Sequence, residues 1–188
     1  MNTLTDVDWS TLPAPDDDGG AAHLEGAALP SLALGSTDGA PVDLAKLNGR
    51  TIVYAYPMTG RPDRSLPEGW DGIPGARGCT PQSCAFRDHY AEVKALGAAH
   101  LFGLSTQDTA YQKEAAERLH LPFALLSDES LAFARALNLP LMPVDGMTLM
   151  KRLTLILRDG RIEHVFYPVF PPDRNAADVM AWLAAHPL

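Results

Sequence analysis

Short apolar segments alternate with longer amphipathic segments through the middle of this 188-residue chain. Residues 51–57 (TIVYAYP), 100–105 (HLFGLS) and 123–127 (FALLS) are rich in β-branched, aromatic or aliphatic residues, which is typical of buried strands. Residues 80–96 and 106–120 have the apolar spacing of helices that bury one face. Strands joined in this order through helices run parallel, with right-handed crossovers. The middle of the chain therefore predicts the parallel part of an α/β sheet.

The flanking segments add antiparallel strands to this sheet. Residues 29–47 contain two short strands around a Ser-Thr-Asp-Gly turn, and residues 153–167 form a second predicted hairpin that turns at Asp159-Gly160. A helix over 128–138 and a closing helix over 175–186, with Asn175 expected at its N-cap, complete the order. This order predicts an α/β domain with a mixed sheet flanked by helices, of the thioredoxin type.

Two segments lack a clear period. Residues 1–22 are rich in acid, glycine and proline, so we expect a flexible leader before a single domain of residues 23–188. Residues 58–78 form a loop that is longer than an ordinary connection, with a glycine at every third position from Gly69 to Gly78. No Lys-Ser/Thr follows the last glycine, so this is not a phosphate-binding loop. Either it is a mobile surface loop or it shapes a site.

The charge of the chain limits its partners. Lys and Arg total 15 and Asp and Glu total 23, which gives a net charge of −8. Such a surface disfavours nucleic acid and anionic membranes as partners. We find no apolar run of transmembrane length and no secretory signal pattern in the first residues. With two cysteines in the chain, a reducing cytoplasm is the simplest expected location.

Both cysteines lie in one segment, Cys79 and Cys84, at the start of the predicted helix 80–96. Two residues five positions apart on an α-helix have Cα atoms about 8.6 Å apart. A disulfide needs Cα atoms closer than about 7 Å, so the pair cannot bond while the helix is intact. The neighbouring residues lack the spacing of a zinc site, so we expect no metal. Inert buried thiols and a redox pair that needs an opening step remain as alternatives.

The position of Cys79 favours a reactive thiol. A cysteine at a helix start faces free backbone N–H groups and the positive end of the helix dipole, which stabilise a thiolate. Arg77 lies close in sequence and can add positive potential. A thiolate after a long loop, at the start of a helix, is the arrangement expected of a catalytic nucleophile.

Several ordered motifs resemble one known family. The segment GCTPQSCAFRD (78–88) resembles the active-site segment of the peroxiredoxins, specifically the bacterioferritin-comigratory or Q-type group. The similarity includes the N-terminal hairpin from residue 29, the stretch FGLSTQDTAYQKEAAERLHLPFALLSDES (102–130) and the hairpin KRLTLILRDGRIEHVF (151–166). It covers about residues 29–185, and it implies the thioredoxin-like fold with an N-terminal hairpin; in this chain the long loop 58–78 lies before the active-site helix.

The resemblance also implies roles for single residues. Cys79 matches the peroxidatic cysteine, Cys84 the resolving cysteine, and Arg152 the arginine that holds the thiolate and the peroxide oxygens. The family's hydroxyl three positions before the cysteine is replaced by Ala76, and the loop is about fifteen residues longer. Pro57 and Thr59 resemble the start of that motif. Either Thr59 folds back to supply the hydroxyl, or a backbone N–H does that work alone; Thr59 is the candidate residue.

The implied activity is a thiol-dependent peroxidase without cofactor, which acts on hydrogen peroxide and organic hydroperoxides. Its expected partners are the hydroperoxide and a thioredoxin-like dithiol, and its expected state is a monomer or weak homodimer. A thioredoxin-like disulfide oxidoreductase would need a C-x-x-C motif, which the chain lacks. The alternative is a redox sensor in which oxidation of Cys79 and Cys84 alters a partner surface without rapid turnover.

Overall fold

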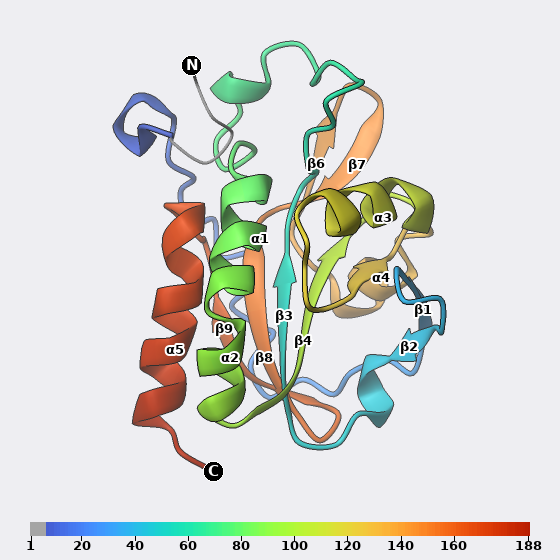
Figure 1. Cartoon of the computed structure of the whole chain (residues 1–188), viewed down its shortest axis with the longest axis vertical. Helices are drawn as coiled ribbons and strands as arrows, with labels where there is room; N and C mark the ends of the chain where they lie inside the picture. Colours follow the sequence, from blue (N-terminus) through green and yellow to red (C-terminus); the bar gives the residue numbers. More distant parts are fainter. Residues whose placement is uncertain (1–6) are drawn as a thin grey trace.

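A mixed β-sheet forms the centre of the molecule (Figure 1). The computed structural model describes residues 7–188. The sheet has the order β2-β1-β5-β4-β3-β8-β9, and its strands are β1 (Ala33–Ser36), β2 (Val42–Asp43), β3 (Arg50–Ala55), β4 (Ala98–Ser105), β5 (Leu125–Ser127), β8 (Leu153–Arg158) and β9 (Arg161–Phe166). The pairs β3–β4 and β4–β5 are parallel and the others are antiparallel, as the order of predicted elements requires. The predicted mixed sheet and both hairpins are confirmed.

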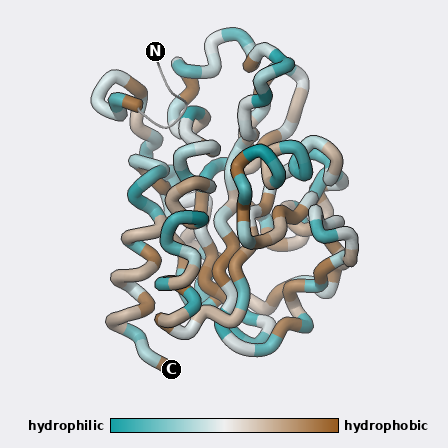
Figure 2. The backbone as a smooth tube through the Cα atoms, viewed as in Figure 1, coloured by the Kyte–Doolittle hydropathy of each residue, from teal (hydrophilic) through white to brown (hydrophobic). Residues whose placement is uncertain are grey.

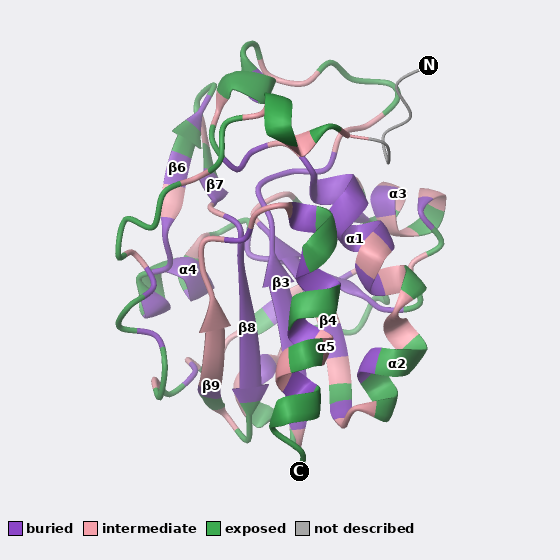
Figure 3. Cartoon of the chain, turned by 90° about the vertical axis from the view of Figure 1, so that its left-hand side faces the viewer, coloured by how far each residue is buried: buried purple, intermediate pink, exposed green. Residues whose placement is uncertain are grey.

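Helices cover both faces of this sheet (Figure 3). One face carries the helices α1 (Cys79–Asp88), α2 (Tyr90–Ala95), α3 (Thr109–Arg118) and α5 (Asn175–Ala185). The other face carries α4 (Ala132–Leu137) and the chain before β1. Short 3-10 turns complete the structure: η1 (Trp9–Thr11), η2 (Leu44–Lys46), η3 (Trp70–Gly72) and η4 (Pro172–Arg174). Because β3 lies between two packed layers, all six of its residues are buried, and the tube in Figure 2 is most hydrophobic along the central strands.

The predicted helix 80–96 is two helices rather than one. α1 ends at Asp88 and α2 begins at Tyr90, because His89 has φ −102° and ψ 14°, outside the helical region. Phe86 from α1 and Val93 from α2 still pack in the same apolar cluster. The apolar period therefore predicted the buried face correctly, although it gave no sign of the break.

A second small hairpin stands apart from the main sheet and was not predicted. It consists of β6 (Leu141–Val144) and β7 (Met147–Met150), which turn at Asp145-Gly146 with positive φ at both residues. Its apolar side chains pack against the loop 58–78, where Trp70 is buried. The long loop is irregular apart from η3. This hairpin therefore provides an apolar surface against which the loop packs.

The segment expected as a flexible leader contacts the domain over its described part. Residues 1–6 lie outside the described residues. From residue 7 onward the segment makes specific contacts: the Trp9 indole donates to Asp173 at 2.9 Å, and the Asp18 carboxylate accepts from Lys151 at 2.6 Å. Packing therefore begins before residue 23, because the aromatic and acidic side chains of this segment find partners on the domain. None of the helices in residues 7–188 has the length and apolar character that a membrane crossing requires.

Candidate active site

The start of α1 holds Cys79 in a buried position. Cys79 is the first residue of the helix and is 3% exposed, and Gly78 before it has φ +110°. A Cβ at residue 78 would lie 2.6 Å from the Pro172 ring and 2.8 Å from the Trp9 ring, so only glycine fits there. The thiol therefore lies at the N-terminus of a helix, and Trp9 and Pro172 pack directly against the preceding residue, Gly78.

Arg152 brings a guanidinium against the Cys79 sulfur. Arg152 lies between β7 and β8 and is 3% exposed, and its Nη2 donates to Cys79 Sγ at 3.3 Å. The same nitrogen contacts the carbonyl oxygens of three consecutive residues at 3.2 Å each, Gly75, Ala76 and Arg77. A permanent charge held in this way beside sulfur is the environment of a nucleophilic thiolate.

The Arg77 side chain does not share this role. Its guanidinium pairs with Asp71 at 2.7 Å on the surface. Arg77 therefore contributes its backbone carbonyl to the site, where it accepts from Arg152, rather than a positive charge.

A buried polar chain fixes Arg152 from the other side. Its Nη1 donates to Gln82 Oε1, and Gln82 Nε2 donates to Asn175 Oδ1 at 2.9 Å. The same Asn175 oxygen accepts from Thr154 Oγ1 at 2.6 Å. The predicted N-cap role of Asn175 is wrong: Arg174 occupies the cap position, and the Asn175 amide is used inside the protein. Gln82 was missed, although its position three residues after Cys79 places it on the same helix face.

Cys84 lies one and a half turns along the same helix and is also buried. Both cysteines are free thiols in an intact α1, as the distance argument from helical geometry requires. Burial raises the pKa of the Cys84 thiol above its ordinary value. In this state Cys84 is a neutral, packed side chain, and its sulfur can bond to that of Cys79 only if α1 opens.

Pro57 and Thr59 are buried directly after β3. The Pro57 carbonyl accepts from Gln107 Nε2 at 3.0 Å, and the Thr59 carbonyl accepts from the Tyr111 hydroxyl at 2.6 Å. Met58 between them packs in the same apolar cluster as Ala76, three residues before Cys79. The start of the long loop therefore lies against the segment that leads into α1.

Two polar atoms among these residues are buried without a hydrogen-bond partner, Thr59 Oγ1 and Arg152 Nε. Within residues 7–188 the other such side-chain atom is Thr51 Oγ1 in β3. An unsatisfied buried donor or acceptor costs about 1–3 kcal/mol, so folded proteins rarely keep one without a reason. One of these atoms thus belongs to the residue that also holds the Cys79 sulfur. Residues 7–188 contain no cluster of three His, Cys, Asp or Glu side chains that could hold a metal.

Comparison with known proteins agrees with this fold. The sequence model of the Redoxin family matches residues 24–180. Peroxiredoxin Q of Oryza sativa subsp. japonica, described as chloroplastic, is 34% identical over 158 residues, which is 83% of this chain and 64% of that protein. Chloroplastic peroxiredoxin Q of Sedum lineare is 32% identical over 161 residues, 85% of this chain and 77% of that protein. The chain thus spans slightly under two thirds of the rice relative.

A solved structure supports the same relationship. The peroxidoxin BcpB from Mycobacterium tuberculosis superposes with a TM-score of 0.70 and 25% identity, and the match covers 88% of this chain and all of that one. The thioredoxin-like arrangement of sheet and helices that the order of elements predicted is thereby confirmed.

Proposed function

Since the chain belongs to the Redoxin family and, within it, to the peroxiredoxin Q group, we propose that it is a thiol-dependent peroxidase that reduces hydrogen peroxide and organic hydroperoxides. The observation that carries the proposal is the contact of Arg152 Nη2 with the Cys79 sulfur. The same guanidinium has a buried donor, Nε, without a partner. The site therefore combines a nucleophile with a cation able to accept developing negative charge.

The first step is attack of the Cys79 thiolate on one peroxide oxygen. The sulfur–oxygen bond forms as the oxygen–oxygen bond breaks, and the leaving hydroxide or alkoxide takes up a proton to become water or an alcohol. Sulfur is oxidised to a sulfenic acid and the peroxide is reduced. Arg152 stabilises the charge that develops on the oxygens, with its Nε as the available donor. Thr59 Oγ1, the other unpartnered atom, is the proposed hydroxyl that orients the peroxide.

The second step joins the two cysteines. The first turn of α1 unwinds, and the Cys84 thiol loses its proton and attacks the Cys79 sulfur. The sulfur–sulfur bond forms as the sulfur–oxygen bond breaks, and the leaving hydroxide takes up a proton to become water. A dithiol such as thioredoxin then reduces the disulfide by exchange through a mixed disulfide. The intact helix explains why unwinding is required: Cys79 and Cys84 lie five positions apart in it, beyond disulfide reach.

We also propose a cellular location, an oligomeric state and a role for Pro57. With both cysteines assigned to turnover, a reducing cytoplasm is the proposed location, and a monomer or weak homodimer is the proposed state. Pro57, which ends the segment after β3, is proposed to fix the direction in which Thr59 enters the site.

The test is thioredoxin-dependent peroxide consumption, coupled to NADPH through thioredoxin reductase. Wild-type protein should turn over hydrogen peroxide repeatedly, and Cys79→Ser should not, because a serine hydroxyl is not ionised at neutral pH. Thr11→Ala, which removes a local contact on an exposed turn, is the matched control and should keep the activity. Substantial turnover by Cys79→Ser would disprove the assignment of Cys79 as the peroxidatic cysteine. Wild-type protein that is oxidised once but does not cycle would favour the redox-sensor alternative.

A further inference from the structure

A segment from the N-terminus, residues 8–18, lies beside the starts of α1 and α5, and we call it the N-terminal clamp (Figure 1). Its first anchor is Trp9. The indole ring lies against the backbone of Gly78, so that a Cβ there would be 2.8 Å from the ring. The indole N–H donates to Asp173 at 2.9 Å, and the ring meets Phe170 edge-on at 6.1 Å between centroids. Trp9 thereby joins the residue before Cys79 to the turn before α5.

The second anchor is a proline in the middle of the clamp. A Cβ at residue 75 would lie 3.4 Å from the Pro15 ring. The carbonyl of Gly75 is one of the three that accept from Arg152. Pro15 therefore covers the outer side of the backbone segment whose inner side Arg152 holds.

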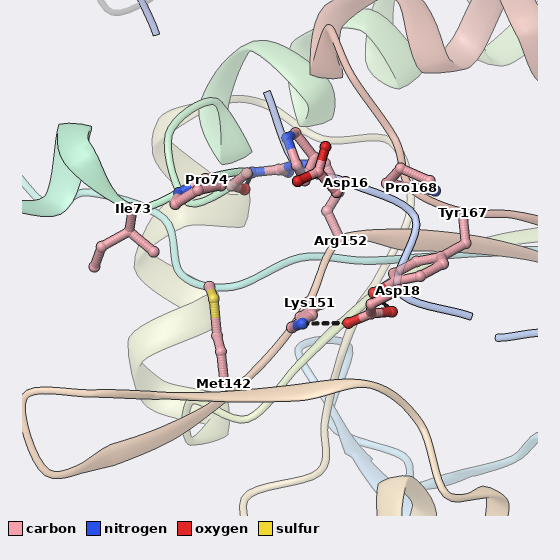
Figure 4. A pocket seen from close by; sticks show the side chains of 11 residues that line it. Asp16, Asp18, Ile73, Pro74, Met142, Lys151, Arg152, Tyr167 and Pro168 are labelled. Carbon is pink, nitrogen blue, oxygen red and sulfur yellow. Dashed lines mark hydrogen bonds and ion pairs between the residues drawn. The ribbon is translucent and has the colours of Figure 1, made fainter. Parts of the chain in front are cut away.

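The third anchor is Asp18, at the end of the clamp (Figure 4). Its carboxylate accepts from Lys151 Nζ at 2.6 Å and from the Tyr167 hydroxyl at 2.7 Å. Lys151 precedes Arg152 in the chain, and all four residues line a pocket of about 320 Å³ together with Pro15 and Gly75. The clamp thus contacts the neighbours of both Cys79 and Arg152 in the chain.

The backbone under the clamp is the part that must move for the two cysteines to meet. Unwinding of the first turn of α1 breaks the hydrogen bond that the Gln82 N–H donates to the Gly78 carbonyl at 3.0 Å, and Trp9 covers Gly78. Resting on the proposed peroxidase function, we infer that Trp9 is a positioning residue for the resolving step: it holds the helix start folded and so slows disulfide formation between Cys79 and Cys84.

The delay has a chemical consequence. A Cys79 sulfenic acid can react with the Cys84 thiol to give a disulfide and water, or with a second peroxide to give a sulfinic acid and water or an alcohol. The first route needs the unwound helix and the second does not. A clamp that holds the helix therefore shifts the sulfenic acid toward over-oxidation, and loss of the clamp shifts it toward the disulfide.

Three variants test this inference: Trp9→Ala, which removes the ring and the N–H, Trp9→Phe, which keeps a ring, and Thr11→Ala as the control within the clamp. Rapid-quench alkylation and mass spectrometry after one equivalent of peroxide measure the disulfide step. We expect Trp9→Ala to accelerate disulfide formation about threefold to tenfold. This is the change in rate that corresponds to the loss of one hydrogen bond and its packing contacts. Trp9→Phe should give a smaller increase and Thr11→Ala none. The sulfinic acid formed with excess peroxide should fall in the same order.

Amide hydrogen exchange on the reduced proteins provides a readout that needs no catalysis. Exchange at the amides of Gln82 and Ser83 should rise in Trp9→Ala relative to Thr11→Ala, while α2 stays protected. An unchanged or slower disulfide step in Trp9→Ala overturns the positioning role, whatever the exchange shows. If wild-type protein does not react with peroxide, the proposed function fails and exchange alone decides whether the clamp holds the helix start.

Discussion

The Nη2 atom of Arg152 lies 3.3 Å from the sulfur of Cys79, although 73 positions separate the two residues in the chain. The sheet explains this contact. β3 and β8 are antiparallel neighbours with Ala55 opposite Leu153, so the chain leaves β3 where it enters β8. The long loop returns from the end of β3 to begin α1 at the same edge of the sheet. A charge from the turn before β8 and the start of α1 therefore meet at the same end of the sheet, with Gly78 in a left-handed conformation directly before the helix.

Replacement of Arg152 by alanine should slow the reaction of Cys79 with peroxide about tenfold to hundredfold, because a lost charge-assisted hydrogen bond is worth about 1.5–3 kcal/mol. Stopped-flow kinetics of the reduced protein measure this step. Arg158→Ala is the control, since it removes a half-exposed arginine from the far end of the same strand β8. A peroxide rate constant unchanged in Arg152→Ala would place this residue outside the chemistry.

Thr59→Val should slow the peroxide reaction about twofold to tenfold, which corresponds to one net hydrogen bond of about 0.5–1.5 kcal/mol. The free energy of unfolding should not fall, because the Thr59 hydroxyl has no partner to lose. Thr51→Val is a matched control, since it removes another buried unpartnered hydroxyl, on β3. Equal peroxide rates in the two variants would leave Thr59 without a role in the reaction.

Cys84→Ser should react with one equivalent of peroxide and then stop. The Cys79 sulfenic acid has no thiol to meet in this variant, so it should accumulate and oxidise further with excess peroxide. Mass spectrometry should find additions of one to three oxygen atoms on Cys79, and Cys79→Ser should show none of them. Full thioredoxin-dependent turnover by Cys84→Ser would instead assign the resolving thiol to another molecule.

Glu163→Gln should lower the free energy of unfolding at pH 7 by about 1.5–3 kcal/mol, the range for hydrogen bonds to charged groups. Arg50 is buried and donates twice to this carboxylate at 2.8 Å, and these bonds lower the pKa of Glu163. A lowered folded-state pKa gives stability that is present above the ordinary glutamate pKa of about 4.3 and is lost as the pH falls through the lowered value. The difference between wild type and variant should therefore shrink in acid.

Urea unfolding at pH 7 and at several values below pH 4 measures this dependence. The control is Glu129→Gln, which changes an exposed carboxylate in the turn before α4. A constant difference between Glu163→Gln and wild type across the whole pH range would show that the Arg50 pair contributes no pH-dependent stability.

Local patterns predicted most of the fold. The Asp159-Gly160 turn has positive φ at both residues, as an Asp-Gly hairpin requires. The hairpin at Asp145-Gly146 carries the same turn signal and was missed, because Pro143 and the methionines around it obscure the strand pattern. The break at His89 has no glycine or proline to mark it, so an apolar period alone predicts one continuous helix.

The site was predictable only where a motif lies within one segment. Cys79 and Cys84 could be found because they stand together at a helix start. The link from Gln82 to Asn175 spans 93 positions and joins two amides that are unremarkable in sequence. The buried Asn175 was mistaken for a cap because asparagine before an apolar run usually is one. Contacts of this kind depend on the packing of α1 against α5, which no local pattern encodes. The roles proposed for Cys79, Cys84, Arg152, Pro57 and Thr59 stay predictions until the variants are measured.

The many acceptors around Arg152 have a consequence for the solvent. In the folded site the guanidinium is held by the carbonyls of residues 75–77, by Gln82 and by the Cys79 sulfur. In the proposed mechanism the first turn of α1 opens and these acceptors separate, and a buried cation without them must be hydrated. The proposed disulfide step is therefore expected to be coupled to water uptake. Excluded osmolytes such as sucrose, which favour the less hydrated state, should slow it, so the osmotic strength around the protein becomes one of the variables that set its catalytic cycle.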